Sequence, residues 1–141
     1  MIAHVVEAVG SPLRARTEVG LPRVGDHPEQ RAWDLAITGE AKRTGMEFEA
    51  RLYDAQNQVR RHNLKRQDDP VDSFVLVVAD TERNREALRL YPDVFSDLPR
   101  LRSADVLKAL RAGKHPPTGY MLLRLRPTKG TDDAQDDGAS D

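Results

Sequence analysis

A strict alternation of apolar and polar residues is the clearest pattern in the chain, and it falls between residues 32 and 52. In its first half, Trp33, Leu35 and Ile37 occupy one side, while Asp34 occupies the other. A period of two with one apolar side is typical of a half-buried β-strand. We therefore expect a strand here, with Asp34 on its polar face.

The second half of this stretch repeats the alternation. Met46 and Phe48 share an apolar side, whereas Glu47, Glu49 and Arg51 share the polar side. A second strand is expected, joined to the first by a polar turn in an antiparallel hairpin.

Turn geometry sets how the two strands face each other. With Thr38 opposite Gly45, Asp34 lies opposite Glu49 on the polar face of the hairpin. A shift of two residues keeps these faces, whereas a slip of one reverses them. The acids and Arg51 then converge on one side of the sheet. They form either a site for a metal ion and a phosphate or a solvated ladder of cross-strand charges.

A basic helix is expected next, at about residues 54–67, with Asp54 as its N-cap. Its only apolar residues are Ala55, Val59 and Leu64, so its buried stripe should be thin. Its basic side chains are Arg60, Arg61, Lys65 and Arg66.

Two interpretations of this helix remain open. Gln56, Arg60 and Asn63 share one face at i, i+4 and i+7 spacing, and that face would lie over the acidic strands. The basic residues would then contact phosphates. Alternatively they form a solvated face, balanced by Asp68 and Asp69.

The rest of the chain completes an α/β pattern. The run 73–81 is rich in β-branched residues, which indicates a strand buried on both faces. The other expected elements are a helix at 2–9, a strand at 13–21, a loop at 22–30, helices at 82–91 and 104–112, and a strand at 120–125. This order predicts a mixed β-sheet flanked by helices. Residues 1–126 should form a single domain, and 127–141 a disordered acidic tail.

Composition narrows the candidate chemistry. The 141 residues include no cysteine, which excludes disulfides and thiolate metal sites, and the net charge is −1. Five aspartates and no lysine or arginine fall in 131–141, so the preceding part has a small positive net charge, which is compatible with nucleic-acid binding. The four histidines lack metal-ligand spacing and are expected to be exposed. Without a signal peptide or an apolar run of about 18–20 residues, we expect a cytoplasmic protein with no membrane partner.

Several of these features resemble the PD-(D/E)xK superfamily of restriction-endonuclease-like phosphodiesterases. Asp34 matches the aspartate of that motif, Glu49 its second acid, and Arg51 stands where a lysine is expected. Gln56 falls at the start of the next helix, where some members carry a glutamine. The resemblance covers about residues 20–81 and implies a three-layer architecture.

The resemblance also implies a chemistry. Asp34 and Glu49 would hold Mg²⁺, with Glu47 as a further ligand and the Ala50 carbonyl completing the shell. Arg51 could contact phosphate but could not act as a base, which favours a weak or degenerate phosphodiesterase. The expected substrate-binding residues are Gln56, Arg60, Arg61 and Lys65, and the expected partner is DNA.

A second resemblance leads to a different hypothesis. The segments RTEVGLP, RAWDLAI, MEFEARLYDAQ and VLVVADTERNREAL are similar to the C-terminal domain of bacterial helix-turn-helix regulators of the Xre type. This resemblance covers about residues 13–125. It implies a non-catalytic regulatory or self-association domain. Because only a short helix precedes Leu13, the helix-turn-helix partner would be a separate domain or protein.

Overall fold

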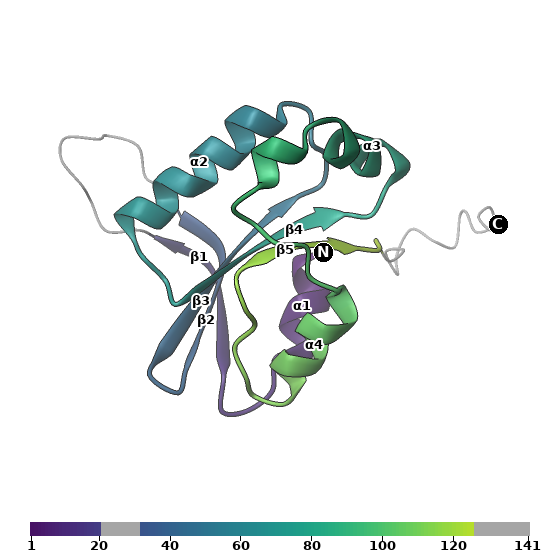
Figure 1. Cartoon of the computed structure of the whole chain (residues 1–141). Coiled ribbons are helices and arrows are strands. Elements are labelled where there is room, and N and C mark those ends of the chain that lie inside the picture. The colour runs from purple at the N-terminus through teal and green to yellow at the C-terminus, as the bar shows by residue number, and fades with distance from the viewer. Residues whose placement is uncertain (21–31, 126–141) are drawn as a thin grey trace.

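The computed structural model describes residues 1–20 and 32–125, which form one five-stranded sheet with helices on both faces (Figure 1). The predicted loop at 22–30 and tail at 127–141 lie outside the described residues. The elements are α1 (Ile2–Ala8), β1 (Arg14–Gly20), β2 (Ala32–Gly39), β3 (Lys42–Glu49), α2 (Ala55–Asp68), β4 (Ser73–Ala79), α3 (Glu82–Leu90), the 3-10 helix η1 (Pro92–Phe95), α4 (Ser103–Arg111) and β5 (Gly119–Leu123). The predicted α/β class with a mixed, helix-flanked sheet is confirmed.

Strand order in the sheet follows chain order, β1-β2-β3-β4-β5. The pairs β1–β2 and β2–β3 are antiparallel, whereas β3–β4 and β4–β5 are parallel. The change occurs where helices enter the connections, because a parallel pair needs a crossover and cannot be closed by a hairpin. All seven residues of β4 are buried, as its β-branched run predicts.

Helices divide the core into two layers. On one face of the sheet, α1 and α4 cover Val75 and Val77 of β4 and Leu35 of β2 (Figure 1). On the other face, α2 and η1 cover Phe74 and Leu76. The alternation along β4 therefore supplies both layers from one strand.

The hairpin between β2 and β3 has a tighter turn than the one predicted. Its two-residue loop consists of Glu40 and Ala41, both with positive φ (56° and 59°). Two-residue turns with this backbone match the twist of antiparallel strands, and they usually carry an Asn-Gly signal that is missing here. Thr38 consequently pairs with Arg43 and not with Gly45. The register moves by two residues, so the polar face is kept.

Replacing Leu110 by alanine tests the α4 layer. Leu110 is fully buried, whereas Leu90 at the end of α3 is 62% exposed. We expect Leu110→Ala to lower the free energy of unfolding by about 2–5 kcal/mol, because it removes apolar burial and leaves a cavity. Urea denaturation measures the loss. The matched control, Leu90→Ala, should change stability by less than about 0.5 kcal/mol. Equal effects would contradict the placement of α4 on the core.

Candidate functional site

The regular backbone pairing between β2 and β3 ends next to Asp34. Its last regular pair is Leu35 with Met46. Beyond it, the Phe48 N–H donates to Asp34 Oδ2 at 2.9 Å, and the Asp34 N–H donates to Glu47 Oε2 at 2.9 Å. Side-chain carboxylates thus replace backbone acceptors at this point. Because the register is shifted, Asp34 meets Glu47, and its predicted pairing with Glu49 is wrong.

Trp33 leaves the face that its alternation predicts. It packs in the α2 layer, whereas Leu35 and Ile37 pack in the α1–α4 layer. Gly45 leaves room for the indole, since a Cβ at that position would lie 3.0 Å from the ring. The indole N–H also donates to Asp69 at 2.9 Å, which satisfies a buried donor. A strand carrying this distortion cannot keep a strict period of two.

Glu47 is the most deeply buried acid of the site, with its side chain 3% exposed. Lys65 Nζ donates to Glu47 Oε1 at 2.6 Å and to the Ala32 carbonyl at 2.9 Å. His62 Nδ1 lies 3.4 Å from the same carboxylate oxygen. A buried carboxylate is tolerated only with such compensation, so Lys65 fixes α2 to both β2 and β3.

Glu49 is held by the same helix. Its two oxygens accept from Gln58 Nε2 and His62 Nε2, each at 2.8 Å. Gln58, His62 and Lys65 follow i, i+4 and i+7 spacing and form the inner face of α2. We call the following set the acid–base cluster: Asp34, Glu47, Glu49, Gln58, His62 and Lys65.

Two cluster members were missed by the sequence-based prediction. Gln58 and His62 are buried, although His62 was expected to be exposed. Leu64, expected in the apolar stripe, is 45% exposed. The prediction placed the face with Arg60 over the sheet, whereas the face with Gln58, His62 and Lys65 lies there. The spacing of Gln58, His62 and Lys65 was the available signal, but a polar stripe is not normally assigned to the buried side of a helix.

Electrostatics inside the cluster differ from group to group. Burial raises the pKa of Asp34, despite opposing contributions from the Phe48 N–H and nearby cations. Burial would also raise the pKa of Glu47, but hydrogen bonds and cations of His62 and Lys65 outweigh it and the pKa is lowered. For His62, burial would lower the pKa, but Glu47 and Glu49 outweigh burial and raise it. The arrangement favours an imidazolium between two carboxylates.

The predicted partners on the loop after β3 form no ion pair or hydrogen bond with the acids in the structure. Arg51 is exposed and its guanidinium pairs with neither Glu47 nor Glu49, which bond to α2 instead. The Ala50 carbonyl, expected as a metal ligand, accepts from Asn84 Nδ2 at 3.0 Å. The main chain of Arg51 still lies near the acids, because Gln58 Nε2 donates to the Arg51 carbonyl at 3.0 Å as well as to Glu49. The role predicted for the Arg51 guanidinium stays a prediction.

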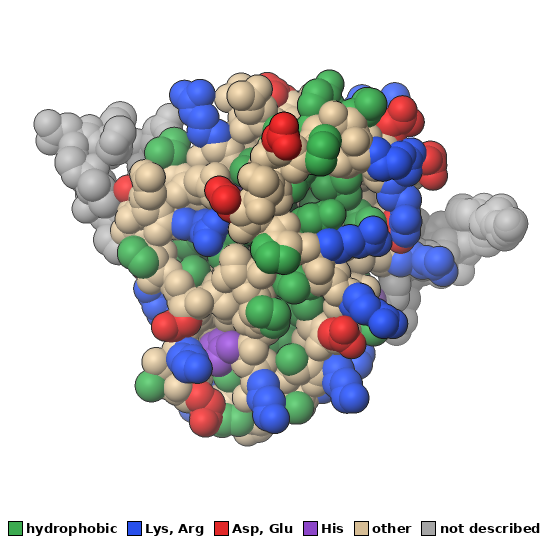
Figure 2. Space-filling view, in the orientation of Figure 1, with side chains coloured by type: hydrophobic (Ala, Val, Ile, Leu, Met, Phe, Trp, Pro, Cys, Tyr) green, Lys and Arg blue, Asp and Glu red, His purple; other side chains and the backbone are tan. Residues whose placement is uncertain are grey.

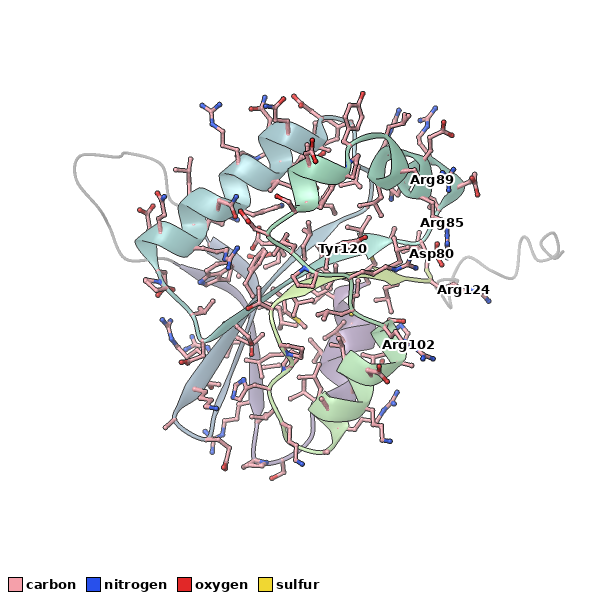
Figure 3. The ribbon with its side chains drawn as sticks, viewed as in Figure 1. Asp80, Arg85, Arg89, Arg102, Tyr120 and Arg124 are labelled. Atoms are coloured by element: carbon pink, nitrogen blue, oxygen red, sulfur yellow. The ribbon has the colours of Figure 1, made fainter. Side chains whose placement is uncertain are left out.

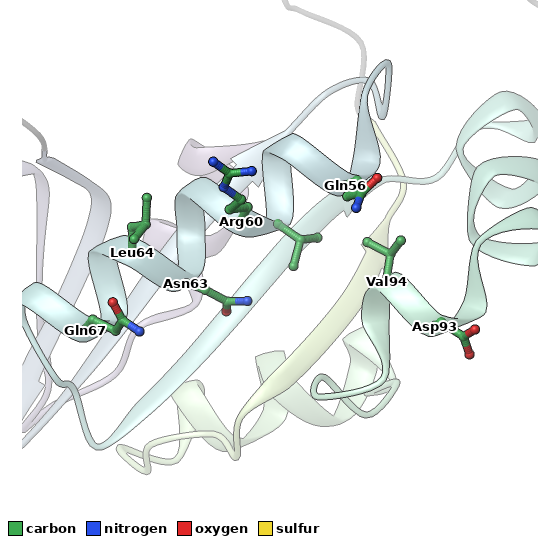
Figure 4. Close-up of a pocket in the computed structure, with 8 residues that line it drawn as sticks. Gln56, Arg60, Asn63, Leu64, Gln67, Asp93 and Val94 are labelled. Carbon is green, nitrogen blue, oxygen red and sulfur yellow. The ribbon is translucent and has the colours of Figure 1, made fainter.

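The predicted substrate-binding residues do not lie together in the structure. Lys65 joins the cluster, whereas Gln56 and Arg60 line a groove of about 480 Å³ between α2 and η1 (Figure 4). Arg61 is exposed on α2. Figure 4 shows Arg60 on the outer side of the helix, away from the sheet. The face predicted to lie over the acids instead faces solvent and η1.

Mg²⁺ fits this donor set poorly. Both oxygens of Glu47 and both oxygens of Glu49 already accept from protein donors. A hard dication needs such oxygens in near-octahedral geometry, so it would have to displace Lys65 and His62. Within residues 1–20 and 32–125, no group of three or more acids and histidines is arranged to hold a metal ion.

No family model, curated protein or solved structure matches the chain. Among the described helices, none is long and apolar enough to span a bilayer.

The pH dependence of stability tests the protonated state of His62. A raised pKa gives a contribution that is complete below the unfolded value, about 6.5, and is lost as pH rises through the folded value. We expect the free energy of unfolding, from urea denaturation between about pH 6 and 9, to fall with rising pH. The fall should be smaller in His62→Gln, with His115→Gln as the control outside the cluster. Parallel curves for wild type and His62→Gln would contradict an imidazolium in the cluster.

Proposed function

We propose that this chain is a nucleic-acid-associated domain of restriction-endonuclease-like architecture, in which the acid–base cluster is a weak or degenerate phosphodiesterase site. The observation that carries the proposal is the division of α2 into two faces. Its inner face bonds to the sheet through the cluster, while Arg60 and Arg61 are exposed on its outer side. Two of its basic side chains, Arg60 and Arg61, are therefore accessible to a partner.

Arg60 and Arg61 are available to a ligand. Among the described residues, neither forms an ion pair with a carboxylate. Asn63 and Gln67 line the groove with η1 together with Arg60 and offer hydrogen-bond donors. Guanidinium and amide groups along one helix are suited to the phosphates of a nucleic acid.

The cluster makes this helix a rigid platform. Its three anchoring side chains span i to i+7, so α2 is held along most of its length. A helix fixed in this way loses little additional freedom when a polyanion binds, which lowers the entropic cost of association. The degenerate site would thus contribute to binding through position and not through chemistry.

Arginine substitution on α2 tests the association with nucleic acid. We expect Arg60→Ala with Arg61→Ala to weaken DNA binding and to reduce the salt dependence of the affinity by about two phosphate contacts. Fluorescence anisotropy with a labelled duplex, at several salt concentrations, measures both. Arg14→Ala with Arg16→Ala on β1 removes the same charge elsewhere and should have a smaller effect. If the wild-type chain does not bind DNA or RNA, the regulatory hypothesis is favoured instead.

Asp34→Asn tests the cluster as a cleavage site. Because burial raises the pKa of Asp34, its charged form is disfavoured in the fold. The amide oxygen of asparagine can still accept from the Phe48 N–H. We therefore expect Asp34→Asn to be at least as stable as wild type, with the same weak response in Mn²⁺ calorimetry and in a nuclease assay. Saturable metal binding and cleavage that disappear in this variant would contradict degeneracy.

A further inference from the structure

A basic cavity lies at the opposite end of the sheet from the β2–β3 turn, where β4 and β5 finish. It has a volume of about 450 Å³ and includes Arg85, Arg100 and Arg102. Its other lining residues are Asp80, Leu101, Ser103, Ala104 and Leu122. The space between the carboxyl ends of parallel strands and the helices that follow them is a common ligand site in α/β proteins.

Three separate segments bring the arginines together. Arg85 comes from α3, and Arg100 and Arg102 come from the segment before α4. Arg124 follows β5, and its positive charge helps to lower the pKa of Asp80. Figure 3 shows Arg85, Arg102 and Arg124 around this edge of the sheet, and Figure 2 shows Lys and Arg side chains along the same side.

One carboxylate orients part of this site. Asp80 accepts from Arg85 Nε at 2.6 Å and from Nη2 at 3.0 Å, which is a bidentate pair. Within the described part of the chain, Arg100, Arg102 and Arg124 form no ion pair. The hydrogen bonds of Arg85 and the charges of Arg124 and Arg100 lower the pKa of Asp80. Cations therefore exceed anions around the cavity.

Main-chain pairing holds Arg100 in place. The Tyr120 N–H donates to the Pro99 carbonyl at 2.9 Å, and the Leu101 N–H donates to the Tyr120 carbonyl at 2.7 Å. This segment thus continues the sheet beyond β5, with Arg100 opposite Tyr120. An arginine on a fixed backbone beside a concave surface is better placed for recognition than one on a mobile loop.

We propose that this cavity binds a phosphorylated ligand of nucleotide size, with its phosphate against Arg100 and Arg102. The fork of a guanidinium matches phosphate oxygens in two hydrogen bonds. Leu101 and Leu122 give the rest of the ligand an apolar surface, as small-molecule sites commonly do. The ligand is a free nucleotide or the terminal nucleotide of a nucleic-acid strand. The cavity shares no lining residue with the outer face of α2.

Calorimetry with adenosine 5′-monophosphate and with adenosine tests the free-nucleotide source. We expect the monophosphate to bind to the wild-type chain. The double substitution Arg100→Ala with Arg102→Ala should lower this affinity by about tenfold or more. The control, Arg60→Ala with Arg61→Ala, removes the same charge from α2 and should stay within about twofold of wild type. Adenosine should bind weakly to every variant. Both arginine pairs are exposed, and circular dichroism checks that the variants fold.

A 5′-phosphorylated oligonucleotide and its 5′-hydroxyl counterpart test the strand-end source. A preference for the phosphorylated strand that Arg100→Ala with Arg102→Ala abolishes would support the site even if the free nucleotide does not bind. Arg102→Glu provides a second variant with a larger expected loss. If no probe depends on Arg100 and Arg102 more than on Arg60 and Arg61, the proposal is overturned. Loss of duplex binding through Arg60 and Arg61 alone reports on the proposed function and not on this cavity.

Discussion

The ion pair between Lys65 and Glu47 is the constraint on which the α2 side of the structure depends. A carboxylate exposed by only 3% cannot remain charged without a close cation, so α2 must approach β3 closely enough for Lys65 to reach it. The same ammonium group also bonds the Ala32 carbonyl at the start of β2. The position of the helix, the opening of the β2–β3 ladder and the burial of His62 all follow from that one approach.

The two helical layers of this protein are stabilised by different kinds of interaction. The α1–α4 layer is aliphatic, with Val5, Leu107 and Leu110 packed against the sheet. Its cohesion comes mainly from apolar burial, which does not itself depend on protonation. The α2 layer combines apolar contacts with buried ionised groups, so its stability changes with their protonation. We therefore expect a change of pH to weaken the α2 layer more than the α1–α4 layer.

Much of the fold could be predicted because local patterns determined it. The presence of β2 and β3, the β-branched run of β4 and the cap at Asp54 each depend on neighbouring residues, and the structure confirms them. The strict alternation within these two strands is not kept, because Trp33 packs in the α2 layer and four consecutive residues of β3 are buried. The site depended on contacts between distant segments. A two-residue turn shifted the pairing of Asp34, and the roles of Gln58 and His62 depended on the rotation of α2. The periodicity of apolar residues does not show which face of a helix is buried when that face is polar.

The segment that carries Arg100 has a consequence for how the sheet ends. By pairing with Tyr120, it covers part of the β5 margin with a short bridge. Unpaired strand margins are where extended peptides add to a sheet, and proteins commonly cover or distort them. Among the described strands, β1 then keeps the more open margin, and Glu18 bends it through a positive φ of 53°. The bridge at Arg100 and the distortion at Glu18 each disfavour the addition of another strand at the positions where they occur.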